Sequence, residues 1–200
     1  DLVAKALPKK LRATSLHWGG GSPTMLKGQD WKRIIDRLHL RFEIPNDAAI
    51  AVELDPRTAS EQYIEALRQN GVNRASIGVQ SFDANIQKAI NRIQPYDMTA
   101  QVISWLRKSG IDKINLDLMY GLPHQTTKMV VREAELTIGL KPTRVALFGY
   151  AHVPWMKSHQ KLIDENALPN AEERWLQFEA SSAKFIEAGY QAVGLDHFSL

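Results

Sequence analysis

Polar groups stand at the ends of several short apolar runs in this sequence. Three glycines, Gly19 to Gly21, follow the run TSLHW, and Glu53 lies near the end of the run AIAVEL. Glycine lets another group approach the main chain closely, and a carboxylate at the end of an apolar strand needs a donor or a cation as partner. The glycines lack the spacing of dinucleotide sites and the Lys-Ser/Thr of a P-loop. A ligand with a compact polar group remains open, beside a plain strand-to-helix turn.

Other candidate residues occupy equivalent places. Gln80 follows ASIGV, and Asp117 lies inside the apolar run INLDLMYGL, which is typical of a strand covered on both faces. A buried aspartate there belongs either to a structural hydrogen-bond network or to a site. Arg92 resembles an ordinary surface arginine, and Asp55 is expected to form an ion pair with Arg57.

The histidines suggest a metal site that the spacing does not favour. His17, His152 and His197 follow different strand-like runs, and with Glu53 or Asp196 they could form a mononuclear centre. No HxH or HxxE spacing supports this arrangement, so the sequence predicts no metal site. The absence of cysteine excludes disulfides and thiolate-bound metals or clusters within this chain.

The elements that would position these residues alternate along the chain. Strand-like runs span 14–18, 49–54, 75–80, 113–120, 144–150 and 190–195. Helix-like amphipathic stretches span 30–40, 58–69, 96–109, 125–138 and 171–188, the second beginning with the capping-box pattern TASE at Thr58. This alternation predicts an α/β fold with a parallel sheet, as a partial or complete (β/α) barrel. Functional groups in such barrels sit at the C-terminal strand ends.

Composition sets the class of protein. With 200 residues, 44% of them hydrophobic and 24% charged, the chain is expected to form one globular domain over 1–200. The net charge of +3 is small and its basic residues are scattered, which argues against a nucleic-acid surface and leaves room for a small acidic ligand. No run is long enough for a membrane span or a signal core. We expect a cytoplasmic protein that binds neither nucleic acid nor membrane.

Several motifs together are more specific than any one. They are HWGGGSPT, VELDPR, SIGVQSFD, INRIQ, INLDLMYGLPHQT, RVALFGYAHVPWMK and GLDHF, in this order. From about Thr14 onward the sequence resembles the oxygen-independent coproporphyrinogen III oxidases (dehydrogenases), radical S-adenosylmethionine enzymes of haem biosynthesis. Haem chaperones share some of these motifs but typically carry EANP where this chain has ELDPR. A non-catalytic relative that binds haem and S-adenosylmethionine remains the alternative.

The resemblance implies a barrel of the radical S-adenosylmethionine type that binds two molecules of this cofactor. Gly20, Gly21 and Ser22 would run along the methionine end of one molecule, and Glu53 would hold a polar group of the same molecule. Further matching positions would contact one of the two molecules; they are Gln80, Arg92, Asp117 and the main chain of Ala151. Arg92 would there pair with a carboxylate. The resemblance assigns no catalytic side chain.

The implied reaction is the oxidative decarboxylation of coproporphyrinogen III to protoporphyrinogen IX. A [4Fe-4S] cluster cleaves S-adenosylmethionine to a 5′-deoxyadenosyl radical in this family, and an electron donor is a further partner. The family's CxxxCxxC cluster loop would lie upstream of Asp1, and its C-terminal region would follow GLDHF. We therefore expect a barrel truncated at both ends, the core fragment of a monomeric enzyme. Alone it should be catalytically inert and should bind S-adenosylmethionine weakly.

Overall fold

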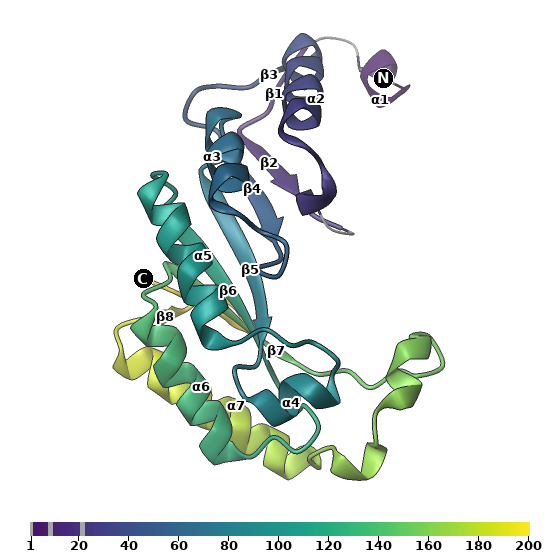
Figure 1. The fold of residues 1–200 in the computed structure, drawn as a ribbon, viewed down its shortest axis with the longest axis vertical. Helices are drawn as coiled ribbons and strands as arrows, with labels where there is room; N and C mark the ends of the chain where they lie inside the picture. The colour runs from purple at the N-terminus through teal and green to yellow at the C-terminus, as the bar shows by residue number, and fades with distance from the viewer. Residues whose placement is uncertain (1, 8–9, 21–22) are drawn as a thin grey trace. The chain divides into compact units, whose positions relative to one another are not determined.

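The structure is a computed structural model that describes residues 2–7, 10–20 and 23–200. Helices and strands alternate through most of the chain (Figure 1). The α-helices are α1 (Leu2–Ala6), α2 (Gly28–Arg41), α3 (Glu61–Gln69), α4 (Ala84–Ala89), α5 (Tyr96–Lys108), α6 (Thr127–Gly139) and α7 (Ala171–Glu187). The strands are β1 (Leu11–Arg12), β2 (Ser15–Trp18), β3 (Phe42–Glu43), β4 (Ala49–Leu54), β5 (Arg74–Gln80), β6 (Lys113–Tyr120), β7 (Arg144–Gly149), β8 (Gln191–Ala192) and β9 (His197–Ser199). Short 3-10 turns are η1 (Pro23–Met25), η2 (Ser158–Leu162) and η3 (Glu165–Ala167).

The chain divides into two compact units. Unit 1 comprises Asp1–Ser76 and Val102–Lys113, and unit 2 comprises Ile77–Gln101 and Ile114–Leu200. Strand β5 therefore begins in unit 1 and ends in unit 2. None of the described helices is both long enough and apolar enough to cross a membrane.

Unit 1 is built from parallel strands and the helices that follow them. Its strand order is β2-β4-β5, with β2 parallel to β4, and β1 and β3 form a separate parallel pair. The four-residue spacing of Trp31 and Ile35 brings both to one side of α2, where they are buried. The Trp31 indole packs edge-on against Trp18, with ring centres 4.7 Å apart, and donates a hydrogen bond to the Tyr63 hydroxyl of α3 (2.8 Å). These contacts hold α2 beside α3 and against β2.

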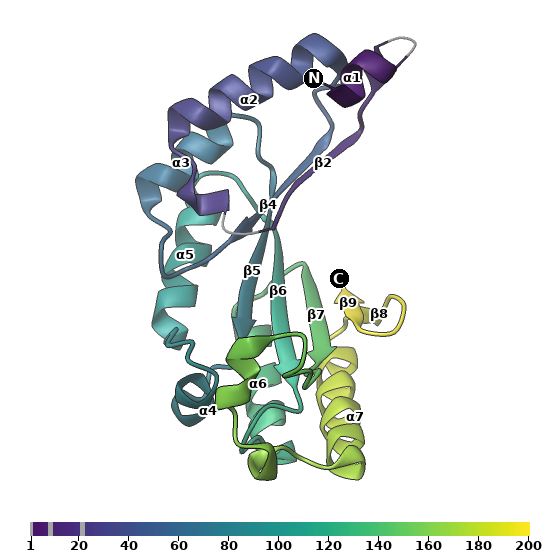
Figure 2. The same cartoon turned by 90° about the vertical axis from the view of Figure 1, so that its right-hand side faces the viewer.

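Unit 2 also contains parallel strands, but antiparallel strands form the edge of its sheet. Its strand order is β5-β6-β7-β9-β8, and β6 is parallel to β7. Helices α6 and α7 lie side by side (Figure 1), and the hairpin of β8 and β9 lies beside β7 (Figure 2). The strands and α7 contribute to a common core that includes Leu116, Val145, Phe185 and Phe198. The predicted α/β fold with parallel strands is confirmed.

The predicted strand at 190–195 is wrong in extent and direction. Only Gln191–Ala192 is extended there, and Gly194 takes a positive φ of 79°, a conformation that suits glycine. The chain then turns back, so β9 pairs antiparallel with both β8 and β7. His197 therefore lies within a strand rather than after one.

Two helix predictions also need correction. The TASE pattern does not place the cap at Thr58, because α3 begins after Ser60, whose hydroxyl accepts the backbone N–H of Tyr63 (3.2 Å). The Thr58 hydroxyl instead donates to the Asp55 carbonyl (3.2 Å). The prediction also omits α4, a short helix that the Asp83 carboxylate caps.

Alternation along the strands separates core residues from the candidate site residues. Successive side chains of a strand project to opposite faces. The buried faces of β4, β5 and β6 carry Ile50, Val52, Leu54, Ala75, Ile77, Val79, Ile114, Leu116 and Leu118. Glu53, Gln80 and Asp117 all project from the other, partly exposed face of their strands. The apolar run around Asp117 is thus covered on one face, not on both as its composition suggests.

A buried carboxyl group in unit 2 connects the loops after β5 and β6. Glu133 of α6 accepts hydrogen bonds from the Ser81 hydroxyl and from Gln125 Nε2 (3.0 Å), and from the backbone N–H groups of Phe82 and Asp83. Burial raises the pKa of Glu133 from 4.5 to about 7, although these hydrogen bonds oppose the shift. The segment that directly follows Gln80 is therefore anchored from inside the unit.

Glu133 should make the stability of this chain depend on pH. Between about pH 4.5 and pH 7 the folded state holds a proton that the unfolded state has lost, so this group's contribution to the free energy of unfolding falls as the pH rises. A pKa shift of this size corresponds to at most about 3 kcal/mol. Glu133→Gln should therefore gain stability relative to the unmodified chain between pH 5 and pH 8 in urea unfolding. The exposed Glu135→Gln is the control, and an equal change in both variants would contradict the assignment.

Candidate cofactor site

In unit 1 the glycine loop lies against the carboxylate of Glu53. Glu53 Oε2 accepts the Gly20 backbone N–H (3.3 Å), and Oε1 lies 3.2 Å from His17 Nε2. A Cβ atom at Gly19 would fall 2.5 Å from Glu53 Oε1 and 2.9 Å from His17 Nε2, so Gly19 has no room for a side chain. The Glu53 side chain remains 47% exposed and can accept further hydrogen bonds. The loop at Gly19 and Gly20 thus accommodates the Glu53 carboxylate, which keeps part of its surface exposed to a ligand.

Two further residues of the glycine loop are predicted to contact the cofactor. Gly21 and Ser22, which the resemblance places along the methionine end of the cofactor, lie outside the described residues. Behind the loop, the predicted ion pair is confirmed: Arg57 donates to both carboxylate oxygens of Asp55, with its closest nitrogen 2.6 Å away. This pair is separate from Glu53, whose partners are His17 and the Gly20 N–H.

In unit 2 the structure brings Gln80 and Arg92 together above a glycine. A Cβ atom at Gly78 would lie 3.0 Å from Gln80 Nε2 and 3.3 Å from Arg92 Nη2. Arg92 Nη2 donates to the Gly78 carbonyl (2.7 Å), and Gln94 Nε2 donates to the same oxygen (3.2 Å). Gln80 has φ 67°, a conformation that is uncommon for residues other than glycine and that turns the chain at the end of β5. Arg92 is therefore held at the strand end rather than free on the surface.

Asp117 and Ala151 are placed by their neighbours in the same unit. Asn115 Nδ2 donates to Asp117 Oδ1 (2.6 Å) on the partly exposed face of β6. After β7, the Ala151 carbonyl accepts a hydrogen bond from Gln160 Nε2 (3.0 Å), and Gln160 Oε1 accepts the Val153 N–H (2.6 Å). Gln160 thus fixes the main chain on both sides of His152.

Each of the histidines considered as metal ligands faces one carboxylate. His17 Nε2 lies near Glu53, and His152 bridges the Tyr150 hydroxyl (3.1 Å) and Glu165 (3.1 Å). His197 Nδ1 lies 2.6 Å from Asp196 Oδ1. Among residues 2–7, 10–20 and 23–200, the acidic, histidine and cysteine side chains form no group of three or more suited to a metal ion.

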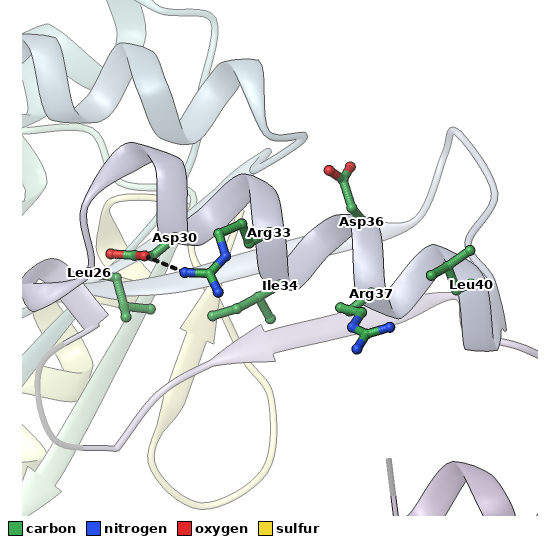
Figure 3. Close-up of a pocket in the computed structure, with 7 residues that line it drawn as sticks. All are labelled: Leu26, Asp30, Arg33, Ile34, Asp36, Arg37 and Leu40. Carbon is green, nitrogen blue, oxygen red and sulfur yellow. Dashed lines mark ion pairs between the residues drawn. The ribbon is translucent and has the colours of Figure 1, made fainter.

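A hollow along α2 is unrelated to these residues. It measures about 630 Å³ and is lined by Leu26, Asp30, Arg33, Ile34, Asp36, Arg37 and Leu40 (Figure 3). Two of the lining residues, Arg33 and Asp30, form an ion pair (3.6 Å). The hollow contains none of the predicted site residues.

Buried glutamines that no motif pointed to support the strand ends of unit 2. Gln87 Nε2 donates to the carbonyls of Ser81 (3.0 Å) and Gln94 (2.6 Å). Gln177 of α7 accepts the Gly121 N–H (2.9 Å) and donates to the Gln125 carbonyl (2.7 Å). No sequence pattern indicated these residues, because a glutamine on an amphipathic helix is expected to be exposed to solvent.

Comparisons with known proteins identify the family of this chain. The family model described as the radical SAM superfamily matches residues 1–137. An oxygen-independent coproporphyrinogen III oxidase of Bradyrhizobium diazoefficiens is 44% identical over 198 residues, which are 99% of this chain and 44% of that protein. An uncharacterised protein of Sinorhizobium fredii, y4hJ, is 44% identical over 98% of this chain and 75% of its own length.

A solved structure shows the same fold. Coproporphyrinogen III oxidase from Escherichia coli, described as a radical SAM enzyme, superimposes with a TM-score of 0.89 at 34% identity, over 93% of this chain and 43% of that one. The chain thus spans less than half of the length of these oxidases. The likeness confirms the predicted partial (β/α) barrel. On these matches, the chain belongs to the radical SAM superfamily.

Proposed function

We propose that this chain works within an oxygen-independent coproporphyrinogen III oxidase, which converts coproporphyrinogen III to protoporphyrinogen IX. The main support is the 44% identity to an oxidase of that name over 99% of the chain. The ELDPR and GYAHVPWMK motifs favour this activity over that of a haem chaperone. Catalysis also requires an electron donor. That the protein is cytoplasmic and monomeric remains a prediction.

The residues of unit 1 fit the methionine end of S-adenosylmethionine. Glu53 offers a partly exposed carboxylate to a ligand amine, since its two present partners are a histidine and one backbone N–H. Because Gly19 has no side chain, the Glu53 carboxylate and the His17 imidazole can lie close to its main chain. A cationic amino group that approaches Glu53 would form a charge-assisted hydrogen bond.

The residues of unit 2 offer a second set of polar groups. The Gln80 amide and the Arg92 guanidinium meet above Gly78, Asp117 lies within β6, and the Ala151 main chain follows β7. We propose that they bind and orient a molecule of S-adenosylmethionine through hydrogen bonds. When bound together with an iron–sulfur cluster, this cofactor supplies the radical that removes a hydrogen atom from a substrate propionate. The barrel residues position the reactants and exclude water.

Gly19→Ala should weaken the binding of S-adenosylmethionine. The added Cβ would displace the Glu53 carboxylate from which it stands 2.5 Å, so we expect an affinity loss of roughly tenfold or more, equivalent to about 1.4 kcal/mol. Titration calorimetry of this chain at high concentration measures it, and we expect weak binding even by the unmodified chain. Gly28→Ala is the matched control, because its Cβ would meet Ala66 at an ordinary 3.4 Å. Equal affinities of the two variants would disprove the role of Glu53.

The complete gene product should decarboxylate coproporphyrinogen III without oxygen. We expect it to contain a CxxxCxxC sequence upstream of Asp1, and to form protoporphyrinogen IX when purified anaerobically with its cluster and S-adenosylmethionine. Fluorescence of the oxidised porphyrins, separated by chromatography, measures the conversion. A gene product that binds haem and shows no turnover would instead support the chaperone alternative and refute the oxidase.

A further inference from the structure

The pair Asp196–His197 in unit 2 is used by none of the roles described above. His197 Nδ1 lies 2.6 Å from Asp196 Oδ1, and the side chains are 27% and 41% exposed, respectively. The Asp196 carbonyl accepts the Leu147 N–H (2.7 Å), which fixes the pair to the edge of β7. An imidazole whose Nδ1 is engaged by a carboxylate presents its Nε2 in a defined direction. Within the part of the chain that the structure describes, His197 Nε2 makes no hydrogen bond.

Sheet register places His197 on the same face as a candidate cofactor residue. His197 is opposite Ala146 on β7, and Ala146 is opposite Asp117 on β6. Residues that are paired across strands project to the same face, and neighbouring strands lie about 5 Å apart. The backbone of His197 is thus about 10 Å from that of Asp117, along one row across the sheet. A ligand reaching the Asp117 face can therefore reach His197.

An aromatic ring accompanies the imidazole. Phe148 follows Ala146 by two residues and therefore projects to the same face. Its ring meets that of His197 edge-on, with centres 5.7 Å apart, and it is 36% exposed. A hydrogen-bond donor beside an exposed aromatic ring matches a ligand that carries carboxylates on an unsaturated ring system.

We propose that His197, oriented by Asp196, binds a carboxylate of the tetrapyrrole substrate. This inference rests on the proposed function, because it assigns a substrate contact to the same site. In the protonated imidazolium, which carries N–H groups on both ring nitrogens, Nδ1–H faces Asp196 and Nε2–H donates to a propionate oxygen. Phe148 packs against the adjoining pyrrole ring. Asp196 acts through His197 as a positioning residue.

Binding of coproporphyrin III by this chain tests the inference. This stable oxidised form carries the same propionate groups and is followed by its fluorescence. His197→Leu should lower the affinity roughly tenfold, because the charge-assisted hydrogen bond to the propionate is lost. Asp196→Asn should cause a smaller loss, and His159→Leu, at an exposed histidine of η2, should cause none. The uncharged tetramethyl ester should bind the unmodified chain and His197→Leu equally.

The outcomes separate this inference from the proposed function. If the unmodified chain does not bind coproporphyrin III, or if His197→Leu binds it as tightly as the unmodified chain does, the assignment of His197 is wrong. The same variant of the complete gene product should raise KM for coproporphyrinogen III about tenfold with a smaller change in kcat. Normal turnover with an unchanged KM would overturn the role of His197 alone. No turnover by the unmodified gene product would overturn the proposed function.

Discussion

The two-residue period of the strands separates core side chains from polar ones in both units. It gives each strand one face for the core and one for polar groups. In β4 the aliphatic residues anchor the strand, while Glu53 projects away from them toward the glycine loop. In β6 the same division leaves Asp117 partly exposed beside a fully buried Leu116. A one-residue slip in either strand would bury a carboxylate and expose a hydrophobic side chain.

Buried polar groups then hold the strand ends of unit 2 in place. Glu133 and the glutamines Gln87, Gln125 and Gln177 hydrogen-bond the backbone of the loops that follow β5 and β6. A buried network of this kind is costly unless every member finds a partner. Its members come from α4, from the segment before α6, and from α6 and α7, so packing of the helices also sets the loops. The raised pKa of Glu133 is the electrostatic consequence of this burial.

Motifs and periodicity predicted most of the architecture and the location of the candidate residues. Alternating apolar runs predicted β4 and β6 to the residue, because each is bounded by turn residues. The hairpin of β8 and β9 was not predicted, because Gly194 reverses the chain inside an apolar run whose pattern is that of a single strand. The meeting of Gln80 with Arg92 also could not be predicted, because it depends on the positive φ of Gln80 and on the space above Gly78. Gln160 carries no local signal, since its partners are main-chain groups of another loop.

We propose that the polar faces of these strands and the loops after them bind S-adenosylmethionine. The most direct measurement is a titration of the isotopically labelled chain with this cofactor, followed by the backbone amide resonances in NMR spectra. We expect shifts at Gly20 in unit 1 and at Gln80, Arg92 and Ala151 in unit 2, with Arg37 of α2 unaffected. Shifts confined to other residues, or none at a saturating concentration, would contradict it.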